Sequence, residues 1–470
     1  MNLWDFKRHT ERTAIVTEEG KKYSYCDVEK LQRKLGRQME ARSLVGMFVN
    51  NNLGGLIGYI SCLEKNNVPI LLPSLKDNVN AWQIIEKYHP QYLWIEEKYY
   101  LKMSVQIEQH YQKTYSFLDY VLLERKQLVK TVLNSDLALL LPTSGSTGNP
   151  KLVRISHKNL LANTKSICKY MNLTEEDRAI TSLPMSYTYG LSVINTHLHV
   201  GGSVFLTTAK VMQRRFWDVI NTFHITFLAG VPYTYEVMKK LHVAQREMPC
   251  LRMMTQAGGK LSVELQQFWG EYAQKTGKKF LVMYGQTEAT ARISFLPNKD
   301  CLRKLGSAGI SIPDSEIMIQ DKEGRKLETP NQEGEVVCYG PQVSMGYAES
   351  LKDLAKGDEN KGALYTGDYG YFDEEGYLFL TGRSNRFAKL LGKRMNLSEL
   401  EKKAANYLGE SVVALSDDRT IFLYTDADVS ESVVQKLITD MGVSVNVFEV
   451  YPKESVPRTN SGKIDYRGAI

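Results

Sequence analysis

Short apolar runs alternate with longer amphipathic stretches through residues 1–383 of this 470-residue chain. The runs Leu44–Val49, Val68–Leu72 and Leu137–Leu141 have the length and character of buried strands. Between the first two runs, Gly54–Leu63 has the length and pattern of a helix. This alternation of strands and helices predicts an α/β fold.

Turn signals become denser after about residue 306. Asp321-Lys-Glu-Gly324 and Asp373-Glu-Glu-Gly376 are typical of hairpin turns, so residues 306–383 are expected to be rich in strands. We expect a domain boundary at Arg383-Ser-Asn385, followed by a small α+β domain, 384–470. Its predicted helices are Ser398–Leu408 and Ser430–Met441, and its predicted strands are Ser411–Leu415, Thr420–Thr425 and Val443–Val450.

The segment Leu141-Pro-Thr-Ser-Gly-Ser-Thr-Gly-Asn-Pro-Lys151 gathers hydroxyl side chains around two glycines and ends in a lysine. Glycines allow close backbone approach, and hydroxyls, backbone N–H groups and a lysine bind phosphate oxygens. A Walker loop would run directly into a helix, whereas here Pro150 intervenes and Leu152–Ser156 is a predicted strand. The pattern predicts a strand–loop–strand hairpin over nucleotide phosphates, with a solvent-exposed Gly/Ser hairpin as the alternative.

Further motifs follow this loop along the chain. They are Tyr284-Gly-Gln-Thr-Glu-Ala289, Gly334-Glu-Val-Val-Cys-Tyr-Gly-Pro341 with Met345-Gly-Tyr347, Tyr365-Thr-Gly-Asp368, Gly382-Arg383 with Lys389-Leu-Leu-Gly392, and Pro457-Arg-Thr-Asn-Ser-Gly-Lys463. In this order they resemble the signature motifs of the adenylate-forming superfamily, which includes acyl- and aryl-CoA synthetases, amino-acid adenylation domains and luciferases. The resemblance extends from about Tyr23 to Ile470.

The resemblance implies a reaction in two halves. A carboxylate attacks the α-phosphorus of ATP, which gives an acyl-AMP and pyrophosphate, and a thiol of CoA or of a phosphopantetheinyl carrier protein then takes the acyl group and releases AMP. It also implies a large N-terminal ATP- and carboxylate-binding core, 1–383, and a small mobile C-terminal domain, 384–470, that carries the catalytic lysine. The expected cofactors and partners are ATP, Mg²⁺, a small carboxylic acid, and CoA or a carrier protein.

The resemblance assigns roles to individual residues. Lys463 is the expected catalytic residue, bridging the substrate carboxylate and the α-phosphate, because the first half-reaction needs preorganised positive charge. Thr287 and Glu288 are the expected Mg²⁺ ligands, with a helix N-cap threonine and a first-turn acid as the alternative. The nucleotide is expected to contact Thr143, Ser144, Gly145, Ser146, Thr147, Gly148, Lys151, Gly258, Gly259, Tyr284, Gly285, Gln286, Asp368 and Arg383.

Several of these residues have more specific expected roles. Asp368 is expected to accept hydrogen bonds from ribose hydroxyls, Tyr284 to offer its ring to adenine, and Arg383 to hold ribose or phosphate. The alternatives are a turn aspartate, a buried core tyrosine and an ion pair at the domain junction. Asn385 stands where relatives usually carry Asp or Lys, and its tolerance of unusual backbone angles suits a hinge for the C-terminal domain.

Pro184-Met-Ser-Tyr-Thr-Tyr-Gly-Leu-Ser192 aligns with the substrate-pocket motif of relatives. Amino-acid-activating members carry an aspartate at the position of Thr188, and that aspartate pairs with the substrate ammonium. Threonine lacks the charge, so we expect a carboxylic acid without an α-amino group. The predicted pocket residues are Tyr187, Thr188, Tyr189, Ser192, Tyr233 and Gln256, each with core packing as the alternative. The competing interpretations are an amino-acid-adenylating ligase and a catalytically silent nucleotide-binding relative.

The composition indicates which kinds of partner and which location to expect. The chain has 59 Lys and Arg against 53 Asp and Glu, a net charge of +6 that does not indicate a nucleic-acid partner. Its six cysteines are scattered, so neither a zinc motif nor a disulfide framework is indicated, and free thiols suit a reducing compartment. The N-terminus lacks an apolar signal core, and no apolar run approaches the ~18 residues of a membrane span, so a cytoplasmic protein is expected.

Overall fold

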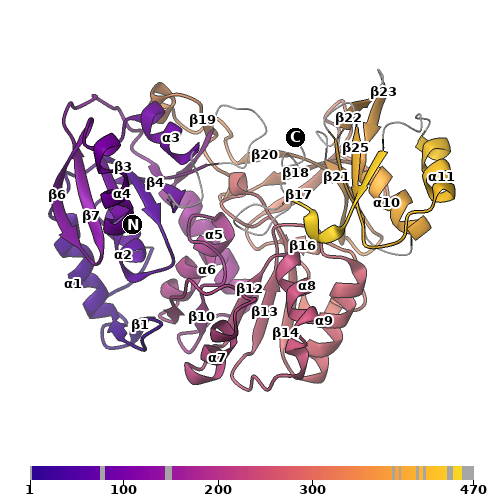
Figure 1. Cartoon of the computed structure of the whole chain (residues 1–470), viewed down its shortest axis with the longest axis horizontal. Coiled ribbons are helices and arrows are strands. Elements are labelled where there is room, and N and C mark those ends of the chain that lie inside the picture. The colour runs from indigo at the N-terminus through magenta and orange to yellow at the C-terminus, as the bar shows by residue number, and fades with distance from the viewer. Residues whose placement is uncertain are drawn as a thin grey trace.

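The computed structural model describes residues 3–74, 80–142, 151–383, 387–390, 393–408, 412–416, 420–441 and 448–457. Within them, the first unit is an eight-stranded sheet in the order β19-β9-β8-β4-β3-β5-β7-β6, seen at the left of Figure 1. Its strands are β3 (Leu44–Val49), β4 (Val68–Pro73), β5 (Tyr92–Glu96), β6 (Tyr111–Phe117), β7 (Tyr120–Arg125), β8 (Leu137–Pro142), β9 (Leu152–Ser156) and β19 (Tyr347–Ala348). The helices of this part are α1 (Tyr25–Gly36), α2 (Leu53–Glu64), α3 (Asn80–Tyr88) and α4 (Glu97–Ile107).

The second unit is a nine-stranded sheet in the order β16-β15-β14-β13-β12-β10-β11-β1-β2. Its strands are β1 (Thr13–Val16), β2 (Lys22–Ser24), β10 (Arg178–Ile180), β11 (Ser203–Phe205), β12 (Phe227–Gly230), β13 (Met253–Gln256), β14 (Lys279–Tyr284), β15 (Ser294–Phe295) and β16 (Ile310–Ser311). The helices between its strands are α5 (His157–Met171), α6 (Thr188–His199), α7 (Arg214–Thr222), α8 (Pro232–Lys240) and α9 (Val263–Lys275), with the short η2 (Val243–Gln245) and η4 (Asn298–Asp300). Strands β10 to β14 run parallel, as strand–helix alternation predicts.

The remaining elements form smaller sheets at the right of Figure 1. A four-stranded antiparallel sheet contains β17 (Glu316–Gln320), β18 (Gly334–Tyr339), β20 (Ala363–Phe372) and β21 (Leu378–Arg383). Short helix η5 (Leu351–Ala355) precedes β20. After these come the hairpin β22 (Phe387–Leu390) and β23 (Lys393–Asn396), α10 (Leu397–Leu408), α11 (Glu431–Met441), η7 (Lys453–Ser455) and the sheet of β24 (Val413–Ser416), β25 (Ile421–Tyr424) and β26 (Phe448–Tyr451).

The predicted elements agree with the structure where it describes them. β3 has the predicted bounds, β4 and β8 each extend one residue further, and α2 extends one residue at each end. Strands β8 and β9 pair antiparallel on either side of the Gly/Ser loop, which confirms the predicted strand–loop–strand arrangement. In the C-terminal part, the strands predicted over 411–415 and 420–425 are shorter or shifted, at β24 and β25. The last of them is described only as β26, since 442–447 lie outside the described residues.

Helix α6 lies between the two large sheets. Its residues from Thr188 to Leu198 are all buried. One side, with Leu191 and Ile194, packs in the core of the eight-stranded sheet, and the other, with Tyr189 and Val193, packs against β12 and β13. Because the helix is enclosed on both sides, its polar side chains must find partners inside the protein.

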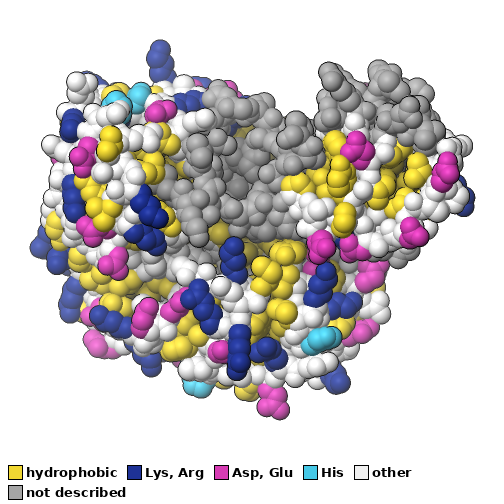
Figure 2. Space-filling model, in the orientation of Figure 1, with side chains coloured by type: hydrophobic (Ala, Val, Ile, Leu, Met, Phe, Trp, Pro, Cys, Tyr) yellow, Lys and Arg dark blue, Asp and Glu magenta, His cyan; other side chains and the backbone are white. Residues whose placement is uncertain are grey.

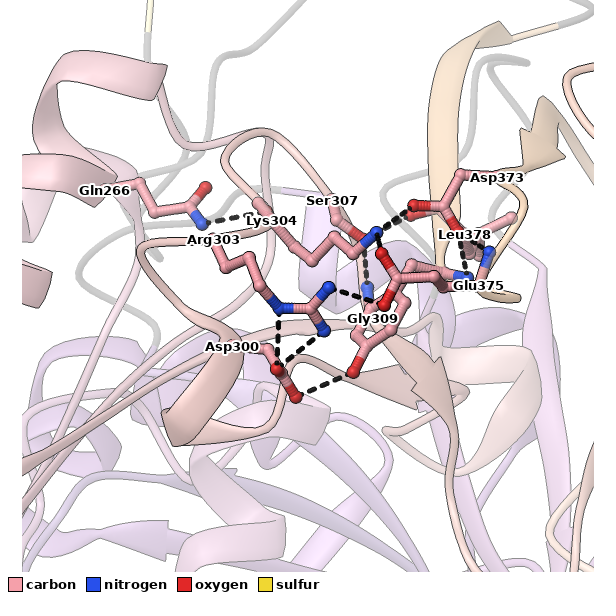
Figure 3. A network of polar contacts seen from close by, with 10 residues as sticks. Gln266, Asp300, Arg303, Lys304, Ser307, Gly309, Asp373, Glu375 and Leu378 are labelled. Atoms are coloured by element: carbon pink, nitrogen blue, oxygen red, sulfur yellow. Dashed lines mark hydrogen bonds and ion pairs between the residues drawn. The ribbon is translucent and has the colours of Figure 1, made fainter.

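A polar network joins the four-stranded sheet to the nine-stranded one (Figure 3). Lys304 Nζ lies 2.6 Å from a carboxylate oxygen of Asp373 and of Glu375, both in the β20–β21 turn. Arg303 pairs with Glu375 and with Asp300, whose carboxylate also accepts a hydrogen bond from Tyr377 at 2.7 Å. These contacts hold the β20–β21 turn beside the segment that follows β15.

The surface visible in Figure 2 carries intermixed charges. Lys and Arg side chains alternate with Asp and Glu over the described part of this face, without a large area of one sign. None of the helices in the described part of the chain combines the length and apolar character needed to cross a membrane.

Candidate active site

The segment from Tyr284 to Arg292 leaves the carboxyl end of β14 and leads to β15. Ligands of parallel sheets commonly bind beyond this edge. The segment is tightly folded, because a Cβ atom on Gly285 would lie 1.8 Å from the carbonyl oxygen of Ala291. Thr290 and Ala291 have φ angles of 53° and 125°, which non-glycine residues rarely adopt. Such strain persists only where surrounding contacts impose it, and it concentrates at functional sites.

Three side chains converge on Asp368 of β20. Its carboxylate accepts hydrogen bonds from the hydroxyl of Tyr284, from Gln286 Nε2 at 2.7 Å and from Arg383 Nε at 2.6 Å. Asp368 is 4% exposed, so these donors compensate a charge that is withdrawn from water. The structure thus brings together four of the residues predicted to contact the nucleotide.

Tyr284 is a donor in this cluster. Burial, reinforced by the neighbouring charge of Asp368, raises the pKa of Tyr284 well above its usual value of 10, so the hydroxyl stays protonated. Its ring packs in an apolar cluster with Ala289 and Ile293. Its surroundings are therefore those of the predicted alternative, a buried core tyrosine, and contact of its ring with adenine stays a prediction.

Thr287 and Glu288 begin the short 3₁₀-helix η3 (Thr287–Ala289). Gln286 holds the N-cap position and makes no side-chain capping bond, so the N-cap alternative for Thr287 is wrong. The hydroxyl of Thr287 is instead hydrogen-bonded to that of Thr188 at 2.8 Å. This contact ties the predicted metal-binding motif to the predicted pocket helix.

Glu288 contacts β19, the strand that pairs with β9. Its carboxylate accepts a hydrogen bond of 2.8 Å from Tyr347, and Lys151 Nζ lies 5.8 Å from the centre of the Tyr347 ring. Lys151 also forms an ion pair of 2.5 Å with Glu349. A partly exposed carboxylate beside a threonine hydroxyl offers hard oxygen ligands, which fits Mg²⁺ that keeps waters and phosphate oxygens as further ligands. The described residues hold no cluster of three or more His, Cys, Asp or Glu side chains that would suit a metal held by protein alone.

The predicted pocket tyrosines lie at the start of α6, beside β13. The Tyr189 hydroxyl donates to the Thr255 carbonyl at 2.8 Å, and the Tyr187 ring stands edge-on to that of Tyr189 at 6.2 Å. The pKa values of both tyrosines are raised by burial, so both stay neutral. Ser192 lies one turn further along α6 and is 7% exposed.

The remaining predicted residues lie around the end of β13. Gln256 donates from Nε2 to the carbonyl of Gly259 at 2.9 Å, and its buried Oε1 has no recorded partner among the described residues. Gly258 has a φ of +87°, a conformation that favours glycine. Tyr233 packs in the same apolar cluster as Tyr187 and Tyr189. No contact recorded between described residues joins this turn to Asp368.

Some predicted residues lie outside the described part of the chain. They are Thr143, Ser144, Gly145, Ser146, Thr147, Gly148, Asn385 and Lys463. Conversely, the structure gives contacts to two residues for which the sequence analysis named no role. Tyr347, there only part of a motif, holds Glu288, and Arg292 is buried beside Ser192. One sequence feature could have drawn attention to Arg292, because it is the only charged residue in the run of small and aliphatic residues Ala289–Ile293.

Comparison with known proteins extends this picture. Residues 4–348 match the family described as AMP-binding enzyme. The chain is 28% identical over 352 residues to oxalate–CoA ligase of Arabidopsis thaliana, which covers 71% of this chain and 66% of that protein. It is 27% identical to a long-chain-fatty-acid–CoA ligase of Bacillus subtilis, of which it spans 49%. The chain thus spans less than two thirds of the length of these relatives.

Solved structures share the fold over nearly the whole chain. O-succinylbenzoate coenzyme A synthetase from Bacillus subtilis, in complex with AMP, has a TM-score of 0.75 at 21% identity and covers 98% of this chain and 97% of its own. ATP-bound MatB from Rhodopseudomonas palustris has a TM-score of 0.77 at 20% identity, and the match covers 100% of this chain and 98% of MatB. At these identities the likeness establishes the fold, whereas the family match over residues 4–348 concerns the sequence itself. This chain belongs to the AMP-binding enzyme family.

Proposed function

We propose that this protein activates a carboxylic acid with ATP and transfers the acyl group to a thiol. In the first half-reaction, a carboxylate oxygen attacks the α-phosphorus, a bond to pyrophosphate breaks, and an acyl-AMP forms. In the second, a thiolate attacks the acyl carbon and AMP leaves. The observation that carries the proposal is the folded segment after β14, which contacts Asp368 through Tyr284 and Gln286 and contacts α6 through Thr287.

The roles proposed for the chain's residues follow from this geometry. Asp368 would accept a ribose hydroxyl, since a carboxylate has about four acceptor positions and three of them are taken by donors here. Thr287 and Glu288 would hold Mg²⁺, which offsets phosphate charge when bound. Lys151 would lie near the β- and γ-phosphates.

Residues outside the described part keep their proposed roles. Thr143, Ser144, Gly145, Ser146, Thr147 and Gly148 would hold the phosphates, Lys463 would stabilise the charge that develops at the α-phosphate, and Asn385 would be the hinge. We place the domain boundary between residues 383 and 384. Rotation about it would separate the adenylation and thiol-transfer states.

The proposed acid lacks an α-amino group. Thr188, where an ammonium-pairing acid would stand, is bonded to Thr287 and carries no charge. The nearest charged side chain recorded along α6 is cationic, since Arg292 approaches Ser192 at 3.5 Å. An ammonium there would be buried beside a like charge, which disfavours an amino acid as substrate.

CoA is the proposed acceptor, with a phosphopantetheinyl carrier protein as the second candidate. The relatives reported above are named CoA ligases, and this supports CoA. Release of AMP on addition of acid and CoA, followed by loss of free thiol, would test that step. A carrier protein replaces CoA as the candidate if the acid supports pyrophosphate exchange but added CoA neither releases AMP nor loses its free thiol.

The test of adenylation is pyrophosphate exchange into ATP. The protein is assayed with Mg·ATP, labelled pyrophosphate and a panel of small aliphatic, hydroxy, aryl and amino acids, beside Lys463→Ala and Asp368→Asn. We expect acid-dependent exchange that both variants reduce. Binding of Mg·ATP without exchange for any acid would favour the silent nucleotide-binding relative, and exchange confined to amino acids would favour the amino-acid ligase.

A further inference from the structure

An open hollow of about 340 Å³ lies where the N-terminal segment packs on the carboxyl-terminal halves of α5 and α6. It is lined by Arg8, His9, Lys165, Cys168, His199 and Val200. This volume is at the lower end of the range of small-molecule sites. Helix α6 has 12 residues and spans about 18 Å, so its end at the hollow lies far from Thr188 at the candidate active site.

The imidazole of His9 forms part of the wall of this hollow. It is 7% exposed, and no hydrogen bond to its ring nitrogens is recorded within the described part of the chain. The carboxylate of Glu175 lies 3.8 Å from Nδ1, which is beyond hydrogen-bond distance, and it also pairs with Arg12 at 3.5 Å. A buried polar group without a hydrogen-bond partner is costly. The ring nitrogens of His9 are therefore available to a ligand in the hollow.

Gly201 fixes the position of the His9 ring. A Cβ atom on Gly201 would lie 2.4 Å from the imidazole, and the φ of +83° at this residue favours glycine. The centre of the His9 ring also lies 5.6 Å from that of Tyr25, whose hydroxyl donates to the carbonyl of Gly202 at 2.7 Å. The imidazole is thus held at the hollow by packing on two sides.

The charged side chains that line the hollow are positive. Arg8 and Lys165 are exposed, and neither has a recorded ion pair among the described residues. None of the described residues that line the hollow is Asp or Glu. Arg12, by contrast, pairs with Glu175 and Glu176. Two uncommitted cations beside an imidazole favour a ligand with about two negative charges.

The carboxyl end of α6 carries a partial negative charge, which opposes an anion. However, its last carbonyl groups already have donors. The Thr196 carbonyl accepts from the thiol of Cys168 at 3.5 Å, and the Leu198 carbonyl accepts from the hydroxyl of Tyr25 at 3.0 Å. His199 directs Nδ1 at a main-chain carbonyl of the N-terminal segment, 2.6 Å away. These contacts leave Arg8 and Lys165 uncommitted.

We propose that this hollow binds a small phosphate monoester, whose phosphoryl oxygens accept hydrogen bonds from Arg8, Lys165 and His9. A phosphate monoester carries close to two negative charges at neutral pH and has three strong acceptor oxygens, which match two cations and one imidazole N–H. About 340 Å³ is the volume of on the order of ten waters, more than one phosphate ion fills. The organic part of the ester would lie beside Cys168 and Val200. This site does not depend on the proposed adenylation.

Calorimetric titration of the full chain with glycerol 3-phosphate tests the site. Saturating Mg·ATP is present throughout, because the Gly/Ser loop of the candidate active site is also expected to bind phosphate. Inorganic phosphate and glycerol are titrated at the same ionic strength. We expect one glycerol 3-phosphate per chain, at least about 5-fold weaker binding of inorganic phosphate, and none of glycerol. Equal affinity for the two anions would overturn the assignment of an ester, and no binding of either would overturn the site.

Charge variants locate the binding. Arg8→Ala combined with Lys165→Ala should weaken binding of glycerol 3-phosphate at least about 10-fold, because both cations donate charge-assisted hydrogen bonds. Lys240→Ala combined with Lys275→Ala removes the same charge from the exposed ends of α8 and α9 and should change the affinity less than about 2-fold. Equal losses in the two double variants, or no loss in the first, would refute the proposal.

His9→Leu tests the buried donor. This variant removes the ring nitrogens, which make no recorded hydrogen bond in the free protein, so the melting temperature without ligand should change little. Its affinity for glycerol 3-phosphate should fall at least about 5-fold, and His9→Gln, which keeps a donor, should lose less. A lower melting temperature with unchanged affinity would show that His9 is structural and would overturn its role in binding.

Discussion

His197 should make helix α6 sensitive to acid. Its side chain is fully buried, and Nδ1 donates to the carbonyl of Val193 at 2.8 Å. Its other ring nitrogen has no recorded partner among the described residues, and the ring stands edge-on to Phe227 at 4.7 Å. Burial lowers the pKa of His197 from 6.5 to about 4, although the Val193 carbonyl and Asp177 oppose the shift. The native state therefore holds this histidine neutral.

The size of the stability loss at low pH follows from the difference between the pKa values of His197 in the folded and unfolded states. Because the folded pKa lies below the unfolded one, the contribution of neutral His197 is complete above pH 6.5 and is lost as the pH falls through 4. At pH 5 the loss is about 2 kcal/mol, and below pH 4 it approaches about 3 kcal/mol. Since α6 carries Thr188 and Ser192, the same protonation would loosen the candidate site.

His197→Leu removes the titrating group. We subtract the free energy of unfolding of the unchanged protein from that of His197→Leu at each pH, so that the effects of all other titrating groups cancel. This difference should be about 2 kcal/mol larger at pH 5 than at pH 7.5. Urea unfolding followed by tryptophan fluorescence at both pH values measures it. His110→Gln, at an exposed histidine, is the control. Equal pH dependence of His197→Leu and the unchanged protein would refute the reasoning.

Three further predictions concern the candidate site and its support. Asp368→Asn should reduce pyrophosphate exchange at least about 10-fold and also lower the melting temperature, because its amide NH2 would face a donor where the carboxylate now accepts from Tyr284, Gln286 and Arg383; an unchanged KM for ATP would exclude a ribose contact. Gly285→Ala should destabilise the protein by about 2 kcal/mol or more in urea unfolding, because its Cβ would lie 1.8 Å from the carbonyl oxygen of Ala291. Asp300→Asn should cost about 1–3 kcal/mol in the same assay by weakening the contacts to Tyr377 and Arg303. The deficit should shrink at low pH, because burial raises the pKa of Asp300 but the hydrogen bonds from Tyr377 and Arg303 outweigh it and lower the pKa overall.

Local pattern predicted the elements well because an apolar run carries its own secondary-structure preference. The buried strands β3, β4 and β8 and the helix α2 follow directly from period and length. The motifs also predict that Tyr284, Gln286 and Asp368 belong to one site, and the structure brings these three into contact. Strand β24 lies one or two residues later than predicted and β25 is one residue shorter at each end, since element ends depend on packing with neighbours.

The sequence by itself determined the α/β class, the order of strands and helices and the family, because these depend on residues close together in the chain. The tertiary structure alone decided which side chains meet. Thr188 and Thr287 are 99 residues apart, and Ser192 and Arg292 are 100 apart. No local period reports whether a buried arginine has an acid beside it, because its neighbours come from a helix and a sheet edge that only folding brings together.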